Sequence, residues 1–250
     1  MANEHWFQIK ETENAEWKFQ FMLWAAIHLP LKWIECFAAV IVFFFYLGAS
    51  PVRKRSRLYL EHVFAMRNQK VPHFAVYRHI LAFALSMVEK IRGWAGKINL
   101  SELETQNDDI DKLIESLDSG EGVFVLCSHL GNIEAIRSLT GFRKEHTHRI
   151  FQVFPVVDFS GTRKFNTILH KLNPSLMKNA FDANTIGPDS VIAMHEKIVS
   201  GNLIAIAGDR TSSHFEKRQI SLPFLGENAA FPEGAFTLAC VLKAPVYFIF

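Results

Sequence analysis

The stretch VFVLCSHLGNIE, residues 123–134, joins a continuous apolar run to a short polar turn. Its first part, Val123–Cys127, consists of apolar, mostly β-prone residues and follows a glycine, which predicts a buried strand. A helix is predicted directly after the turn, from Ile133 to Leu139. Strand, turn and helix in this order form the repeating unit of a parallel sheet, so the stretch favours an α/β fold.

The same alternation of helices and strands surrounds this unit. A helix is predicted from Asp108, because apolar residues recur at helical spacing up to Leu117. The further expected elements are a strand Ile150–Val157, a helix Arg163–Leu172, a helix Asp189–Val199, a strand Leu203–Ala207, a helix Ala235–Leu242 and a strand Pro245–Phe250. We therefore expect a mixed, largely parallel sheet flanked by helices. Because the last strand ends without a turn or cap, we expect the natural chain or its relatives to continue past Phe250.

The N-terminal part is predicted to be helical, with helices at Ser56–Asn68 and His73–Arg92. Its most apolar run, Trp33–Ala49, contains one charged residue and lies at the lower end of the length range that can span a bilayer. Basic residues follow the run at positions 53, 54, 55 and 57, a pattern typical of a cytoplasmic membrane boundary. The run could cross a membrane, lie on one, or form a buried helix before a solvated basic turn.

We accordingly divide the chain into an N-terminal helical, membrane-associated region at residues 1–96 and an α/β domain at residues 97–250, which we expect to be incomplete at its C-terminus. About half of the residues are apolar and the formal net charge is +2, which argues against disorder and against a nucleic-acid partner. Cys36, Cys127 and Cys240 have no zinc or disulfide spacing, which fits a reducing cytosol. Cys127 ends an apolar strand and is interpreted as a core residue rather than a nucleophile.

His129 and Glu134 lie in the polar turn that follows the first strand. In open α/β sheets, ligands and catalytic groups gather at the carboxyl ends of the strands. A carboxylate that orients an imidazole and stabilises its cation allows the histidine to act as a general base. The five-residue spacing alone fits a hydrogen-bonded structural histidine equally well.

Several segments of the sequence resemble the motifs of a known protein family. The segment SHLGNIE resembles the His-x4-Asp/Glu signature of glycerolipid-type acyltransferases, in particular the lauroyl and myristoyl transferases of lipid A biosynthesis and the related proteins of aryl polyene clusters. Further segments resemble other blocks of that family in the same order: Pro51–Leu60, Gly201–Arg210, Leu222–Gly226 and Gly234–Leu242. The resemblance covers roughly residues 20 to 250 and implies a glycerolipid-acyltransferase-like α/β fold.

The resemblance also implies roles for individual residues. His129 would deprotonate the acceptor hydroxyl and Glu134 would be its partner. Asp209 and Arg210 would lie beside the site, where the guanidinium would contact phosphate or the thioester region of the donor. A surface ion pair is the alternative for these two residues.

Three further candidates concern substrate binding. Arg163 would contact a headgroup or the carrier, or merely flank a helix. Glu233 and Gly234 resemble the acceptor-positioning block of phospholipid acyltransferases, although Ala235 and Phe236 stand where a threonine and an arginine normally follow. Without the resemblance, this segment is a turn that leads into a helix.

The implied activity is direct transfer of a fatty acyl chain to a hydroxyl of a lipid or glycolipid. The donor would be an acyl thioester of acyl carrier protein or coenzyme A, and no metal or other cofactor is required. The expected location is the cytoplasmic face of the bacterial inner membrane. Two other functions remain open: a non-catalytic lipid-binding protein on the same fold, and a thioesterase or hydrolase.

Overall fold

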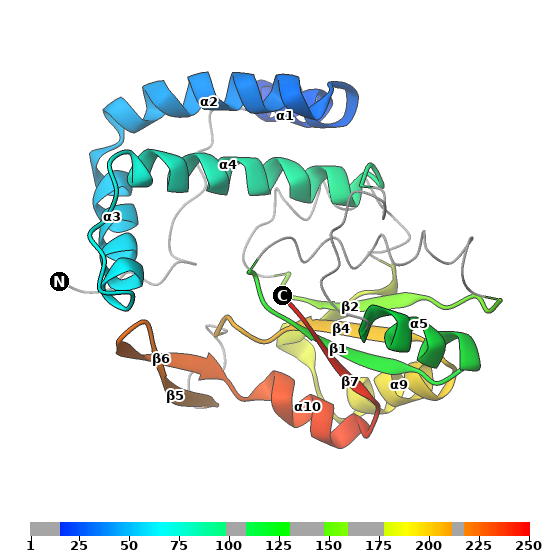
Figure 1. Ribbon diagram of the computed structural model, residues 1–250. Coiled ribbons are helices and arrows are strands. Elements are labelled where there is room, and N and C mark those ends of the chain that lie inside the picture. The colour runs from blue at the N-terminus through cyan, green and yellow to red at the C-terminus, as the bar shows by residue number, and fades with distance from the viewer. Residues whose placement is uncertain (1–15, 99–108, 131–147, 160–177, 212–217) are drawn as a thin grey trace. The chain divides into compact units, whose positions relative to one another are not determined.

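The computed structural model describes residues 16–98, 109–130, 148–159, 178–211 and 218–250 (Figure 1). The chain divides into two compact units. One unit contains Gly93–Ile220 and Ala230–Phe250, and the other contains Ala15–Arg92 and Ser221–Ala229. The predicted helices Ile133–Leu139 and Arg163–Leu172 lie outside the described residues.

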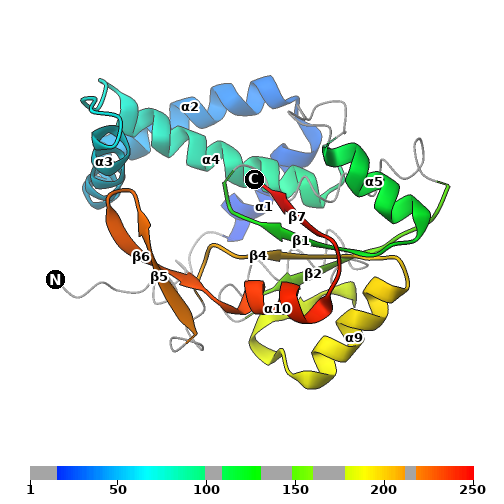
Figure 2. The same cartoon turned by 60° about the horizontal axis from the view of Figure 1, so that its bottom comes forward.

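A parallel sheet forms the centre of the first unit. Its strands are β1 (Val123–Cys127), β2 (Val153–Val157), β3 (Phe181–Asp182), β4 (Leu203–Ala207) and β7 (Val246–Ile249). The described strands are arranged in the order β3-β2-β4-β1-β7, and all neighbours are parallel (Figure 2). The predicted α/β class with a parallel sheet is therefore confirmed.

Helices cover both faces of this sheet, and β1 contributes alternate side chains to each layer. On one face, α5 (Asp109–Ser119) packs Leu113 and Leu117 against Val123, Val125 and Cys127. On the other face, α9 (Pro188–Val199) and α10 (Gly234–Leu242) pack against Phe124 and Leu126. All five residues of β1 are buried, as expected for a central strand of a sheet covered on both sides.

The end of α9 packs closely against the residue that precedes β1, and this contact requires a glycine at position 122. A Cβ atom at Gly122 would lie 2.0 Å from the backbone oxygen of Ile198, which side-chain motion cannot relieve. We expect Gly122→Ala to lower the free energy of unfolding by about 1–3 kcal/mol, measured by urea denaturation in detergent. Gly187→Ala is the matched control, because a Cβ there meets nothing within 4 Å, and its effect should stay below about 1 kcal/mol. Equal effects of the two substitutions would contradict this account.

The second unit is built from four helices. They are α1 (Glu16–His28), α2 (Leu31–Gly48), α3 (Ser50–Ala65) and α4 (Ala75–Trp94, which ends in the first unit). Helix α3 begins six residues earlier than predicted, because Pro51 occupies its first turn, where its missing N–H costs nothing. Helix α2 is long and apolar enough to cross a membrane, yet only 11% of it is buried. This exposure fits a membrane-associated region and argues against an ordinary buried helix.

A β-hairpin, β5 (Gln219–Phe224) and β6 (Glu227–Pro232), was not predicted from the sequence. Prolines at positions 223 and 232 break the usual strand pattern. The turn itself is formed by Leu225 and Gly226, both with positive φ angles, of 52° and 83°. These values are typical of the tight turns that connect two hairpin strands.

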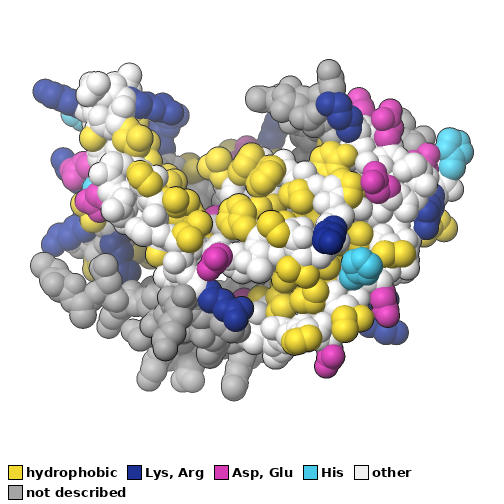
Figure 3. All heavy atoms as spheres, turned by 90° about the horizontal axis from the view of Figure 1, so that it is seen from below, with side chains coloured by type: hydrophobic (Ala, Val, Ile, Leu, Met, Phe, Trp, Pro, Cys, Tyr) yellow, Lys and Arg dark blue, Asp and Glu magenta, His cyan; other side chains and the backbone are white. Residues whose placement is uncertain are grey.

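Hydrophobic side chains also reach the surface of the first unit, on the face that carries α9 and α10 (Figure 3). Helix α9 exposes Ile192 and Val199, and α10 exposes Phe236 and Val241. Exposed apolar side chains are common on protein surfaces and do not by themselves assign a function to this face.

Candidate functional site

Strands β1 and β4 end side by side, and this positions the candidate site. Cys127 pairs with Ala207 at the last rung of the two strands, and the Gly208 backbone N–H donates to the Cys127 carbonyl at 2.9 Å. The residues that follow each strand therefore emerge next to each other at the carboxyl edge of the sheet. Cys127 itself is buried and packs in the core, as predicted.

Two hydrogen bonds join His129, after β1, to Asp209, after β4. The His129 backbone N–H donates to Oδ2 of Asp209 at 2.8 Å, and Nδ1 of the ring lies 2.8 Å from Oδ1. A carboxylate can only accept, so Nδ1 carries the proton and Nε2 keeps its lone pair in the neutral ring. The carboxylate thus sets both the position of the loop and the tautomer of the imidazole.

The environment of Asp209 keeps it ionised. Partial burial acts to raise the pKa of its carboxyl group, but the hydrogen bonds from the ring and backbone of His129 outweigh burial. The pKa therefore lies below its ordinary value. Both side chains stay partly accessible, at 24% for His129 and 27% for Asp209, so a substrate can approach the pair.

Gly208 allows the end of β4 to lie close to its neighbours. A Cβ atom there would approach the Leu126 side chain to 2.8 Å and the Cβ of Ala235 to 3.5 Å. Because Gly208 directly precedes Asp209, this contact between the end of β4, β1 and α10 determines where the carboxylate lies.

Of the other predicted site residues, some lie in the described part of the chain and some do not. Glu134 and Arg163 lie outside the described residues. Arg210 follows Asp209 and is exposed. Glu233 is the exposed N-cap residue of α10, and Gly234 begins that helix in open space. Within the described part of the chain, Asp209 is the hydrogen-bond partner of His129, and neither Glu233 nor Gly234 bonds to it.

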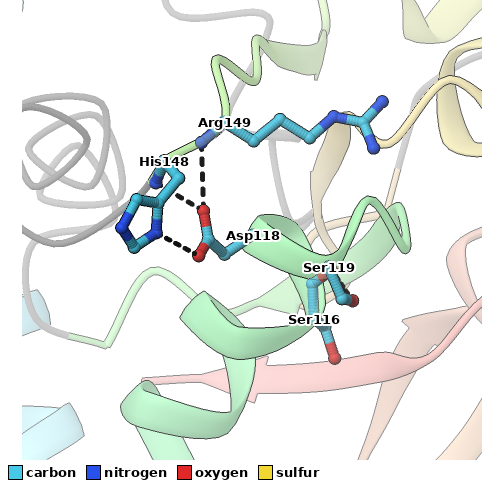
Figure 4. A network of polar contacts seen from close by, with 5 residues as sticks. All are labelled: Ser116, Asp118, Ser119, His148 and Arg149. Atoms are coloured by element: carbon cyan, nitrogen blue, oxygen red, sulfur yellow. Dashed lines mark hydrogen bonds and ion pairs between the residues drawn. The ribbon is translucent and has the colours of Figure 1, made fainter.

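A second histidine–aspartate pair has the same bonding pattern at the opposite edge of the sheet (Figure 4). Both the backbone N–H and Nδ1 of His148 bond to Asp118, at 2.6 and 3.2 Å, and the Arg149 N–H adds a third contact at 3.0 Å. These bonds, chiefly that from the His148 ring, lower the pKa of Asp118. The His148 side chain is 97% exposed, and Asp118 lies in the last turn of α5, before β1 begins. We interpret this pair as a link between α5 and the segment before β2.

No group of three or more histidine, cysteine, aspartate or glutamate residues suited to a metal ion occurs among the described residues. The carboxyl edge of the sheet instead offers one oriented imidazole beside one carboxylate. This arrangement suits removal of a proton from a hydroxyl or similar group.

The fold and the site together define an α/β protein with a histidine–carboxylate pair at the carboxyl ends of two neighbouring parallel strands. The family model of the bacterial lipid A biosynthesis acyltransferases matches residues 7–250, and the chain belongs to this family. The family implies an acyltransferase that acts on lipid A-like substrates, as the sequence motifs predict. No curated protein matches the chain.

The sequence does not predict the contact between Asp209 and His129. It predicts Asp209 beside the site, paired with Arg210. A usable signal was present, because Asp209 follows an apolar strand by two positions, as His129 does. What the sequence did not indicate is that these two strands are neighbours.

Proposed function

We propose that the protein transfers a fatty acyl chain from an acyl thioester to a hydroxyl of a lipid A-like glycolipid, with His129 as the general base. The observation that carries the proposal is the 2.8 Å contact between Nδ1 of His129 and Asp209, which leaves Nε2 as the acceptor of a proton. The donor carrier is acyl carrier protein or coenzyme A.

The chemistry follows from this geometry. Nε2 takes the proton of the acceptor hydroxyl as its oxygen attacks the thioester carbonyl carbon, which gives a tetrahedral oxyanion. The carbon–sulfur bond then breaks, the imidazolium returns the proton to the leaving thiolate, and the products are an ester and a free thiol. The Asp209 carboxylate stabilises the imidazolium between these steps.

Other residues are assigned supporting roles in this proposal. Arg210 is exposed beside Asp209, and its guanidinium suits the phosphate groups of the acceptor or the donor carrier. Glu134 is proposed as a further carboxylate near His129, and Arg163, Glu233 and Gly234 as acceptor or carrier contacts. These five assignments rest on the family's motifs.

The site of action is proposed to be the cytoplasmic face of the inner membrane. The exposed apolar surface of α2 and the basic residues at the start of α3 support this placement. Among branches of the family, membership of the aryl polyene group stays a prediction.

The test uses the full chain in detergent with lauroyl and myristoyl thioesters, each on acyl carrier protein and on coenzyme A, and a lipid A precursor as acceptor. Mass spectrometry should show an acceptor that is heavier by one acyl chain, and the preferred thioester identifies the carrier. Release of free fatty acid alone would make the protein a thioesterase. Binding of the acceptor without consumption of any thioester would make it a lipid-binding protein.

A further inference from the structure

We propose that α2 lies flat in the surface of an anionic bilayer, with one face inserted among the lipids, and does not cross the membrane. The proposal deepens the membrane association of the proposed function and rests on it. It is drawn from the helical unit alone, and it commits to a lipid surface as the partner of α2.

Helix α2 has two opposite stripes, and only one of them is covered. Ile34 and Val42 are buried, and Ala38 and Tyr46 between and after them are partly buried. On the opposite side, large apolar residues recur at the spacing of a single helical face. They form what we call the insertion face, with exposed fractions of 62% for Trp33, 56% for Phe37, 57% for Val40, 67% for Phe44 and 56% for Leu47.

Helix α4 lies beside α2 and runs in the opposite direction. Near one end, the Tyr77 hydroxyl donates to the Ala39 carbonyl at 2.9 Å, and its ring contacts Tyr46. Near the other end, burial first and the charge of Glu35 second raise the pKa of Glu89. Both views show α2 and α4 side by side (Figures 1 and 2).

This packing couples the orientation of α2 to that of α4. If α2 crossed a bilayer, α4 would have to cross beside it. Residues 80–88, the uncharged stretch of α4 between His79 and Glu89, make up only about 14 Å of helix, whereas the hydrocarbon core is about 30 Å thick. A crossing orientation would place charged groups of α4 in hydrocarbon, which is costly.

The charges near α2 suit a flat orientation. Arg53, at the start of α3, donates to the carbonyls of Tyr46 and Leu47 and so caps the end of α2. Lys54, Arg55 and Arg57 follow it and are exposed. Cations that directly follow an apolar helix are typical of segments that bind anionic lipid surfaces.

Depth measurements distinguish the two orientations. Single cysteines replace Trp33, Val40 or Leu47 in a Cys36→Ser, Cys240→Ser background, and an environment-sensitive fluorophore is attached in vesicles of phosphatidylcholine and phosphatidylglycerol. The three positions lie on one face, so a flat helix should place all three labels at similar depths. A crossing helix would place the Val40 label about 10 Å deeper than the other two, which would overturn the proposal.

Vesicle binding of Phe44→Glu gives an independent readout. Phe44 is 67% exposed, so the substitution should leave the fold intact and lower the partition coefficient at least about tenfold. Val199→Glu, on α9 and 68% exposed, is the matched control and should bind as the wild type does. Equal binding of the Phe44 variant and the wild type would overturn the proposal.

Acyl transfer measured in the same vesicles separates failure of this proposal from failure of the proposed function. Transfer with the Val40 label deeper than the Trp33 and Leu47 labels would overturn the flat orientation alone. Similar depths without transfer would overturn the proposed activity alone.

Discussion

Replacing His129 with alanine is expected to lower the rate of acyl transfer by about 10²- to 10⁴-fold, because the acceptor hydroxyl loses its proton acceptor. Transfer is measured as labelled product per unit time, with thioester and acceptor saturating. The fold should be retained, since His129 lies in a loop after β1 and does not belong to the sheet core.

The matched control is His148→Ala. His148 bonds to Asp118 with the same two donor atoms that His129 uses toward Asp209, but it lies at the opposite edge of the sheet. We expect this control to keep acyl transfer within about twofold of the wild type. Full activity of His129→Ala would show that the histidine is structural and that the proposed mechanism is wrong.

Replacing Asp209 with asparagine is expected to lower acyl transfer by about 10²-fold or more. A neutral amide does not stabilise the imidazolium, and its NH₂ group favours the tautomer with the proton on Nε2, which cannot accept the hydroxyl proton. The main loss should appear in kcat, because Asp209 acts through His129 on the chemical step. Asp118→Asn is the matched control and should leave kcat unchanged.

An alternative role for Asp209 is purely structural, since it also accepts the His129 backbone N–H. Asp209→Glu separates the two roles, because it keeps the charge but moves the carboxylate. A structural role predicts that both Asp209 variants lose activity in proportion to their loss of folded protein. The catalytic role predicts that Asp209→Asn loses a modest amount of stability but stays folded at the assay temperature, so its loss of activity is far larger than its loss of folded protein.

The pH dependence of stability provides a further check on the same pair. Because the pKa of Asp209 is lower in the folded than in the unfolded chain, its ionised form stabilises the folded state. This contribution should be complete above about pH 5, and should be lost as the pH falls below about 4 and through the folded-state pKa. Urea denaturation of wild type and Asp209→Asn at several pH values should show a difference that is constant near neutrality and shrinks in acid.

The local pattern predicts the main elements of the sheet unit well. Val123–Cys127 and Leu203–Ala207 are predicted at the bounds that the structure shows, because glycines or turns flank short apolar runs. The strand expected at Ile150–Val157 is shorter, at Val153–Val157. The hairpin β5–β6 was missed, because its prolines suppress the strand signal and its turn residues, Leu225 and Gly226, do not match the common Asn-Gly or Asp-Gly turns.

The sequence predicts His129 as a site residue, but it does not predict the contact between His129 and Asp209. His129 is recognisable because it follows a strand, and the family's motif identifies it. Its observed hydrogen-bond partner is 80 residues away in the sequence, and no local pattern connects the two. The partner expected from spacing, Glu134, lies outside the described residues and stays a prediction.

The amino-acid sequence by itself determined the α/β class, the principal strands and helices, the apolar run of α2 and the family. These features depend on the periodicity and composition of short segments, which a single chain displays directly. Only the tertiary structure decided that β4 lies between β1 and β2, and hence that Asp209 meets His129. It also decided that α2 leaves one face uncovered. Strand order and helix packing depend on contacts between distant segments, so they arise only when the whole chain folds.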